Sequence, residues 1–290
     1  MSEPATQNRR AILITGASTG IGKASTLRMI ERGCQVFAGV RKQADAETLR
    51  AEAGEHCHPV IIDVTQAETI ASARDEVQAA VSETGLQGLV NNAGIVVGGA
   101  LEIVPIEELR KQFEVNVIGQ IAVTQAFLPL LRQGKGRIVM MSSIAGRSAM
   151  PFTSPYCSSK FALEALSDSL RIELTPWGIP VSLIEPGAIQ TPIWDKAQSD
   201  AQAIQSHMSE EGKQLYGDIL ERFYEKVQQV AAGAAPVSKV ADAVEKALTA
   251  SRPKARYPVG RDARMRFILE AMPTRWRDGL LRKLVGVKQS

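Results

Sequence analysis

A short apolar run, a glycine-rich turn and a helical pattern follow one another near the N-terminus. The apolar run covers residues 11–14, the turn reads Thr15-Gly-Ala-Ser-Thr-Gly-Ile-Gly22, and the helical pattern extends to residue 32, where Gly33 can end the helix. The first turn of a helix has free backbone N–H groups that bind anions. The pattern therefore predicts a site for the pyrophosphate of a dinucleotide, although its G-x-x-x-G-x-G spacing differs from the G-x-G-x-x-G fingerprint. The alternative is a strand-to-helix turn with incidental glycines.

The rest of the chain alternates between segments typical of strands and of helices. This alternation predicts a parallel sheet covered by helices on both faces. The expected strands lie near 11–15, 35–40, 59–63, 88–91, 136–142, 180–185 and 255–259, and the expected helices near 21–32, 44–53, 67–83, 106–132, 156–174 and 238–250. The 290 residues are 44% hydrophobic and contain no proline- or glycine-rich linker. We therefore expect a single α/β domain, residues 1–290, with a Rossmann-type doubly wound sheet of about seven strands.

A hydroxyl, a phenol and an ammonium group follow the fifth expected strand. Ser143 comes at the end of this strand, Tyr156 follows it by 13 residues, and Lys160 comes four residues later. If a helix begins near Tyr156, Lys160 lies one turn further along the same face. The pKa of a free phenol, about 10, is too high for a base at neutral pH, and a nearby cation favours the phenolate. The spacing predicts a tyrosine that transfers a proton, although many helices contain a solvated Tyr–Lys pair by chance.

Together these motifs resemble those of the short-chain dehydrogenase/reductase family, in its single-domain NAD(P)-dependent branch, from about Ala11 to about Gly260. The family motifs Thr-Gly-x-x-x-Gly-x-Gly, Asn-Asn-Ala-Gly and Pro-Gly-x-x-x-Thr match residues 15–22, 91–94 and 186–191. The resemblance implies four catalytic residues: Asn116, Ser143, Tyr156 and Lys160. It also implies the residues that bind the cofactor: Gly16, Ser18, Thr19, Gly20, Ile21, Gly22, Asp63, Val64, Asn91, Ala93, Gly94, Tyr156, Lys160, Pro186, Gly187 and Thr191. Asp63 is expected to close the third strand.

The end of the second expected strand distinguishes the two nicotinamide cofactors. An acidic residue there would bind both ribose hydroxyls of NAD, but this chain has Val40 followed by Arg41 and Lys42. The planar guanidinium of Arg41 is suited to a 2′-phosphate, so we expect Arg41 to bind the cofactor and NADP(H) to be preferred over NAD(H). Thr19 counts against this preference, because relatives that prefer NADP often have a basic residue there. Arg41 and Lys42 can also be an ordinary charged loop.

The family resemblance implies a mechanism. Tyr156 donates a proton to a carbonyl oxygen as hydride reaches the carbon, and Ser143 hydrogen-bonds that oxygen. Lys160 lowers the pKa of the phenol and holds the nicotinamide ribose, while Asn116 fixes a water that links Lys160 to solvent. The expected activity is that of an alcohol/ketone oxidoreductase. Two alternatives remain: a 3-oxoacyl-thioester reductase, and a non-catalytic NAD(P)-sensing protein, a type that usually lacks the tyrosine or the lysine.

The segment 192–236 is too long to be a plain connection. Its apolar residues recur at three- and four-residue steps, which predicts amphipathic helices that form a lid over the substrate. They are Trp194, Ala197, Ala201, Ile204, Met208, Tyr216, Ile219, Leu220, Phe223, Val227 and Val230. A large lid with aromatic residues favours a lipophilic secondary alcohol or ketone that is steroid-, retinoid- or hydroxyacyl-like. In lid and length the chain resembles retinol, hydroxysteroid and hydroxybutyrate dehydrogenases.

Three cysteines, Cys34, Cys57 and Cys157, have neither disulfide nor metal-ligand spacing. This predicts reduced thiols in a cytoplasmic protein without a metal site. Residues 1–10 are polar and lack the apolar core of a secretory signal, and we find no apolar run long enough to span a bilayer. We expect a homodimer or homotetramer, a small-molecule substrate, and no nucleic-acid partner, because no nucleic-acid motif accompanies the basic residues.

The C-terminal tail, about residues 261–290, contributes most of the excess positive charge. From residue 253 onward there are ten basic and three acidic residues, a net charge of +7, whereas the whole chain has +3. Apolar residues such as Trp276, Leu280 and Leu284 are interleaved with the cations, so the tail can form a helix with an apolar and a basic face. We expect the apolar face to pack on the domain or on a partner subunit. Association with an anionic membrane surface is the alternative, which we favour less.

Overall fold

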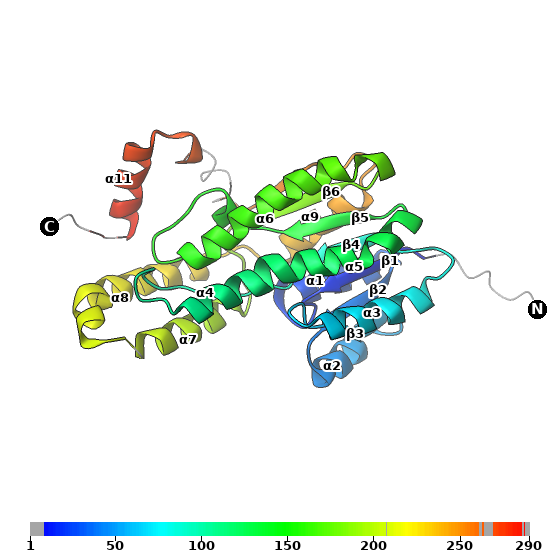
Figure 1. The fold of residues 1–290 in the computed structure, drawn as a ribbon, viewed down its shortest axis with the longest axis horizontal. Helices are drawn as coiled ribbons and strands as arrows, with labels where there is room; N and C mark the ends of the chain where they lie inside the picture. Colours follow the sequence, from blue (N-terminus) through cyan, green and yellow to red (C-terminus); the bar gives the residue numbers. More distant parts are fainter. Residues whose placement is uncertain (1–8, 207, 261–262, 264–268, 286, 288–290) are drawn as a thin grey trace, which may run out of the picture.

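Seven parallel strands form one sheet in the order β3-β2-β1-β4-β5-β6-β7 (Figure 1). This computed structural model describes residues 9–206, 208–260, 263, 269–285 and 287. The order of the strands reverses between β1 and β4, and doubly wound sheets bind ligands at the carboxyl ends of the strands beside such a reversal. The predicted fold class is confirmed. The strands are β1 (Ala11–Thr15), β2 (Gln35–Val40), β3 (Cys57–Ile61), β4 (Gly88–Asn91), β5 (Arg137–Met141), β6 (Val181–Pro186) and β7 (Arg256–Val259).

Helices cover both faces of the sheet, and each face has its own apolar core. One core lies beneath α3 (Ala67–Ala80), α5 (Gly119–Gln133) and α6 (Ser154–Glu173). The other lies beneath α1 (Gly20–Glu31), α2 (Gln43–Ala53) and α9 (Ser238–Thr249). Successive side chains of β1 enter opposite cores, Leu13 the first and Ile12 and Ile14 the second. Burial on both faces explains why these strands are nearly continuous apolar runs.

The third strand occupies different residues from those predicted. β3 spans Cys57–Ile61 rather than 59–63, and its last backbone bond to β2 runs from the Ile62 N–H to the Val40 carbonyl. Asp63 therefore lies beyond the strand and does not close it. Its carboxylate accepts hydrogen bonds from the backbone N–H of Thr65 (3.0 Å) and from the Thr65 hydroxyl (2.8 Å). This turn directs the chain away from the sheet toward α3.

The helix predicted at 106–132 contains a change of geometry. It consists of α4 (Ile106–Phe113), a π-helical turn at Glu114–Ile118, and α5. The helix Ile106–Gln133 is long and apolar enough to cross a membrane, with a mean hydropathy of 1.3 over 18 residues, contrary to our expectation from the sequence. Half of that window is buried inside the domain, where α5 contributes Val123 and Phe127 to the core. Packing against the sheet is a sufficient reason for its apolar composition.

Two helices occupy the segment predicted as a lid, and a third follows in the tail. α7 (Ile193–Ser206) and α8 (Glu210–Ala232) contact each other at one end of the molecule, and α11 (Thr274–Val285) contacts α8 there (Figure 1). Ser209 caps α8 by accepting a hydrogen bond from the Gly212 N–H (3.1 Å). Of the tail, residues 261–262, 264–268, 286 and 288–290 lie outside the described residues.

Candidate active site

The predicted serine, tyrosine and lysine lie at the junction of β5 and α6. Ser143 follows β5 and precedes a short 3₁₀ turn at Ile144–Gly146, and its Oγ accepts a hydrogen bond from the Ala145 N–H (3.1 Å). α6 begins at Ser154, with Pro155 in its first turn. Tyr156 therefore lies in the first turn of α6 and Lys160 one turn later, in the arrangement that the sequence predicted.

Burial controls the charges of the Tyr156–Lys160 pair. Lys160 is 4% exposed, and its ammonium donates a hydrogen bond to the Met141 carbonyl (2.7 Å) and lies 5.7 Å from the centroid of the Tyr156 ring. Burial lowers the pKa of Lys160 to about 8. Burial raises the pKa of Tyr156 to about 12, although a hydrogen bond with the Ser143 hydroxyl acts in the opposite direction. The expected lowering of the pKa of the phenol toward neutral pH is therefore wrong for this structure, because desolvation is the largest effect on it.

An extended segment after β4 lies along the helix that contains Asn116. Asn116 is fully buried in the π-helical turn, and its side-chain amide exchanges two hydrogen bonds with the backbone of Ile95, accepting at 2.8 Å and donating at 3.0 Å. One turn earlier, Gln112 accepts a hydrogen bond from the Val97 N–H (2.6 Å). One turn later, Gln120 donates to the Ala93 carbonyl (2.8 Å). The helix thus fixes the backbone that borders the predicted cofactor site.

Asn91 continues this series of bonds, and its side chain is turned away from the site. It is fully buried at the end of β4 and donates a hydrogen bond to the Thr124 hydroxyl (2.7 Å). Its side chain can position the strand, whereas contact with a cofactor would have to come from its backbone. The motifs in the sequence indicated Asn116 but not Gln112, Gln120 or Thr124. The available signal was a row of four polar residues at four-residue steps along one helix.

The glycine-rich turn is closely packed, and its geometry fits a dinucleotide. Gly16 has a φ of +64°, and a Cβ atom on Gly22 would lie 2.1 Å from the Gly16 carbonyl oxygen. The amide of Asn92 supports the turn by donating hydrogen bonds to the Thr15 carbonyl (2.9 Å) and the Gly16 carbonyl (3.1 Å). At the N-terminus of α1, the side chain of Thr19 makes no capping hydrogen bond and the first turn has no acidic residue. The N–H groups of this turn are therefore suited to a pyrophosphate.

The remaining predicted cofactor residues lie around this turn. Gly20 is close to Thr191, whose Cβ atom would be 3.4 Å from a Cβ atom built on Gly20. A Cβ atom built on Gly94 would lie 3.4 Å from the amide oxygen of Asn116. Pro186 ends β6, and its carbonyl accepts a hydrogen bond from the Ser143 hydroxyl (3.4 Å). The structure thus brings the ends of β1, β4, β5 and β6 together.

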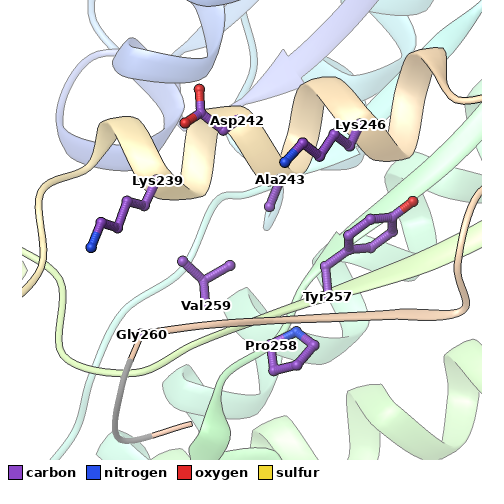
Figure 2. Close-up of a pocket in the computed structure, with 8 residues that line it drawn as sticks. All are labelled: Lys239, Asp242, Ala243, Lys246, Tyr257, Pro258, Val259 and Gly260. Carbon is purple, nitrogen blue, oxygen red and sulfur yellow. The ribbon is translucent and has the colours of Figure 1, made fainter. Parts of the chain in front are cut away.

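Five further predicted residues lie on the connections that leave the strands and at the start of α1. Arg41 is exposed directly after β2, Val64 is buried beyond β3, and Gly187 donates a backbone hydrogen bond to the Val259 carbonyl (2.8 Å). Ser18 and Ile21 are partly buried at the start of α1. A separate hollow of about 550 Å³ lies between α9 and β7, and the residues that line it include Lys239, Lys246 and Tyr257 (Figure 2). None of the predicted catalytic or cofactor residues lines that hollow.

A cluster of buried charges lies one helical turn beyond Lys160. Glu164 on α6 and Glu185 on β6 are both buried, and Arg256 on β7 lies within 3.1 Å of the Glu164 carboxylate and 3.3 Å of the Glu185 carboxylate. Arg256 also donates to Asp168 (2.7 Å). Burial is the largest cause that raises the pKa of Glu185, to about 7, and the pKa of Glu164 is raised for the same reason. The sequence analysis did not predict this cluster.

Comparison with known proteins shows the family. Residues 10–202 match the model of the family described as short chain dehydrogenase. The chain belongs to the short-chain dehydrogenase/reductase family, and it is an oxidoreductase that uses a nicotinamide cofactor, NAD(P). A protein from Burkholderia cenocepacia, solved as a short chain dehydrogenase in complex with NADP, has a TM-score of 0.72 and 25% sequence identity, and the likeness covers 97% of this chain and 98% of that one.

Curated relatives are similar over most of their length. An NADPH-dependent 3-dehydrocapnine reductase from Ornithobacterium rhinotracheale is 39% identical over 86% of this chain and 88% of its own. A 17-beta-hydroxysteroid dehydrogenase type 6 from Bos taurus is 38% identical, over 93% and 87%. A retinol dehydrogenase 5 from Mus musculus is 35% identical, over 93% and 87%.

Proposed function

We propose that this enzyme transfers hydride between NADP(H) and a lipophilic alcohol or its carbonyl counterpart, of the retinoid or steroid type. The observation that carries the proposal is the meeting of Ser143, Tyr156 and Lys160 at the carboxyl edge of the sheet. This edge adjoins the glycine-rich turn, where a dinucleotide fits, and the lid helix α8. The proposed substrate therefore lies between the end of the cofactor and α8.

The protein's own residues position the substrate and move the proton. The bound nicotinamide supplies or accepts the hydride. Because the pKa of Tyr156 is raised to about 12, its phenol keeps its proton at neutral pH and can donate it to a carbonyl oxygen during reduction. The Ser143 hydroxyl hydrogen-bonds the same oxygen and stabilises the developing negative charge. The Lys160 ammonium favours the phenolate that remains.

The lid supports a lipophilic substrate. Phe223 on α8 packs edge-to-face against Phe152, with ring centroids 5.3 Å apart, and Phe152 lies just before α6 and its Tyr156. The Tyr224 ring follows at 5.6 Å from Phe223, and burial raises the pKa of its phenol to about 12. Aromatic side chains at the start of the helix that contains the proton donor give apolar contact area suited to a polyene or a steroid ring system. The names of the hydroxysteroid and retinol dehydrogenase relatives agree with this class of substrate.

Three features support NADP(H) rather than NAD(H). Val40 is buried at the end of β2 and the next residue, Arg41, is exposed, so a guanidinium rather than a carboxylate is available at this edge. One relative is named as NADPH-dependent, and one structural neighbour was solved with NADP. The expected homodimer or homotetramer and the cytoplasmic location stay predictions.

The test is a substrate and cofactor screen with the purified enzyme. All-trans-retinol, a 17β-hydroxysteroid, their carbonyl counterparts and a 3-oxoacyl thioester are each assayed with NADP(H) and with NAD(H), and a Tyr156→Phe preparation serves as the control for contaminating activity. We expect the highest kcat/KM for a retinoid or steroid with NADP(H). Preferred turnover of the thioester would favour the 3-oxoacyl-thioester reductase instead. Failure of Tyr156→Phe to remove the activity would refute the assigned proton donor.

A further inference from the structure

The apolar residues of α11 divide into two sets, and one set fixes the helix to the domain. Leu281 and Val285 are buried, at 7% and 2% exposed. α11 contacts the lid helix α8, and the ammonium of Lys226 on α8 donates a hydrogen bond to the backbone carbonyl of Leu284. These contacts hold α11 in one orientation, so its opposite face is a defined surface of the protein.

The other set forms an apolar stripe on that outward face. Trp276, Leu280 and Leu284 follow one another at four-residue steps and are 71%, 46% and 53% exposed. Of the expectation that the apolar face of the tail packs on the domain or on a partner subunit, packing on the domain is met by Leu281 and Val285 and not by these three. A tryptophan and two leucines exposed in one row are typical of a surface that contacts something else.

Basic residues border this outward stripe on both sides. Successive residues of a helix are rotated by about 100° around its axis. Viewed along this axis, Lys283 projects just outside the direction of Trp276, at one edge of the stripe, and Arg277 projects just outside the direction of Leu284, at the other edge. α11 contains four basic residues and one acidic residue, a net charge of +3. Residues 1–252 carry a net charge of −4, which is the difference between +3 for the whole chain and +7 for residues 253–290. The excess positive charge is therefore concentrated in the C-terminal segment that contains the apolar stripe.

We propose that the outward face of α11 binds the surface of an anionic phospholipid membrane. Trp276, Leu280 and Leu284 enter the interfacial region of the bilayer, and Lys283 and Arg277 contact lipid phosphates at its surface. Tryptophan suits this depth because its ring is apolar and its N–H is polar. This inference is independent of the proposed substrate and cofactor.

The charge of α11 distinguishes between two possible partners of this surface, a membrane and a second copy of the chain. A two-fold symmetric contact between two α11 helices would place the basic residues of one helix next to those of the other, which is unfavourable. An anionic bilayer instead neutralises them and releases counterions. Figure 1 shows α11 beside α8 at the end of the molecule away from β1–β3. A membrane bound there lies next to the lid, where a lipophilic substrate would arrive.

The test is cosedimentation of the full chain with vesicles of phosphatidylcholine alone or with about 30% phosphatidylserine, at about 0.15 M salt. We expect binding to the anionic vesicles and weak binding to the neutral ones. Substituting Trp276→Ser, Leu280→Ser and Leu284→Ser together should lower the partition coefficient at least about tenfold. The double substitution Arg277→Gln and Lys283→Gln should lower binding to anionic vesicles about fivefold for each charge removed, with little effect on neutral vesicles.

Trp177→Ser is the matched control, because this tryptophan is also exposed (51%) but lies in the 3₁₀ turn Thr175–Trp177 between α6 and β6. It should leave vesicle binding unchanged. Brominated lipids should quench Trp276 in a protein with Trp177→Phe and Trp194→Phe, which tests the contact without altering α11. No binding to anionic vesicles, or binding that the triple variant retains, would overturn the proposal. If the wild-type protein is a dimer that does not bind vesicles, and the triple variant is a monomer, the partner of this surface is a second copy of the chain.

Discussion

Replacing Glu185 by glutamine should make the protein more stable at alkaline pH, in contrast to the usual effect of removing a buried ion-pair partner. Glu185 is fully buried on β6, and its Oε1 lies 3.3 Å from Arg256 and 3.5 Å from Arg147. Its Oε2 has no hydrogen-bond partner among the residues that the structure describes. Burial, and then the neighbouring carboxylate of Glu164, raise the pKa of Glu185 from 4.5 to about 7, while the two arginines lower it. Ionisation of Glu185 is therefore unfavourable in the folded protein.

The sign and size of the effect follow from this pKa. Since the pKa in the folded protein is above the unfolded value, the stabilising contribution of the protonated carboxyl is complete below pH 4.5 and is lost as the pH rises through about 7. A rise from 4.5 to about 7 corresponds to about 3 kcal/mol. Glutamine avoids this loss but also removes an anion from two arginines, which keep Glu164, Asp168 and Glu270 as partners. We therefore expect Glu185→Gln to raise the free energy of unfolding by about 1–3 kcal/mol at pH 8.5.

Urea unfolding between pH 5 and 8.5 measures this difference. At pH 5 the carboxyl and the amide are both neutral, and the two proteins should differ by less than about 1 kcal/mol. Glu270→Gln is the matched control, because Glu270 pairs with the same Arg147 at 3.3 Å but its side chain is 35% exposed. The control should show no such gain at high pH. The reasoning is refuted if wild-type protein becomes more stable relative to Glu185→Gln as the pH rises.

Four further substitutions test the site. Tyr156→Phe should lower kcat about 10²–10⁴-fold while cofactor affinity, measured by fluorescence titration, is retained; activity within a few-fold of wild type would remove Tyr156 from catalysis. Arg41→Ala should weaken NADP(H) at least about tenfold more than NAD(H), and a wild-type preference for NAD(H) in kcat/KM would contradict this. Gly22→Ala should abolish cofactor binding, because the new Cβ atom would lie 2.1 Å from the Gly16 carbonyl; unchanged affinity in the same titration would show that the turn is not the pyrophosphate site. Gln120→Leu should lower the free energy of unfolding by about 1–3 kcal/mol in urea, since it leaves a buried carbonyl unpaired, and an unchanged value would show that this bond contributes little.

The parts of the fold that the sequence predicted are those that depend on local pattern. Strands buried on both faces are apolar throughout, and the helices between them have the spacing of one buried face, so their order and approximate bounds could be predicted. The end of β3 could not, because the turn at Asp63 depends on hydrogen bonds to Thr65. That the apolar stripe of α11 faces away from the domain could not be predicted for a related reason. Helical spacing shows which residues share a face, and it does not show which face meets the domain.

The candidate site was predicted in position but not in its electrostatics. The spacing of Ser143, Tyr156 and Lys160 indicated that these groups meet, and the structure brings them together. The sequence could not indicate that burial raises the pKa of Tyr156 to about 12. Desolvation depends on every residue that packs around the phenol. For the same reason Glu164 and Glu185, 21 positions apart in the sequence, gave no signal of forming a buried pair.

The row of polar residues on the helix from Ile106 to Gln133 shows how the fold places the site. Four helical residues rise about 6 Å, and two residues of extended chain span about 6.6 Å, so the two spacings nearly coincide. Gln112, Asn116, Gln120 and Thr124 can therefore each bond the extended segment at every second residue, near positions 97, 95, 93 and 91.

An ordinary α-helix would not keep these four side chains in line, because a four-residue step exceeds its turn of 3.6 residues and the row would rotate around the helix. The π-helical turn at Glu114–Ile118 has more residues per turn and compensates for this rotation. It does so at Asn116, which lies close to Gly94 and whose amide, like that of Gln112, also donates to the Ser159 hydroxyl on the helix of Tyr156 (3.3 Å each). The irregular turn is therefore what allows one helix to hold both the cofactor-side backbone and the catalytic helix in register.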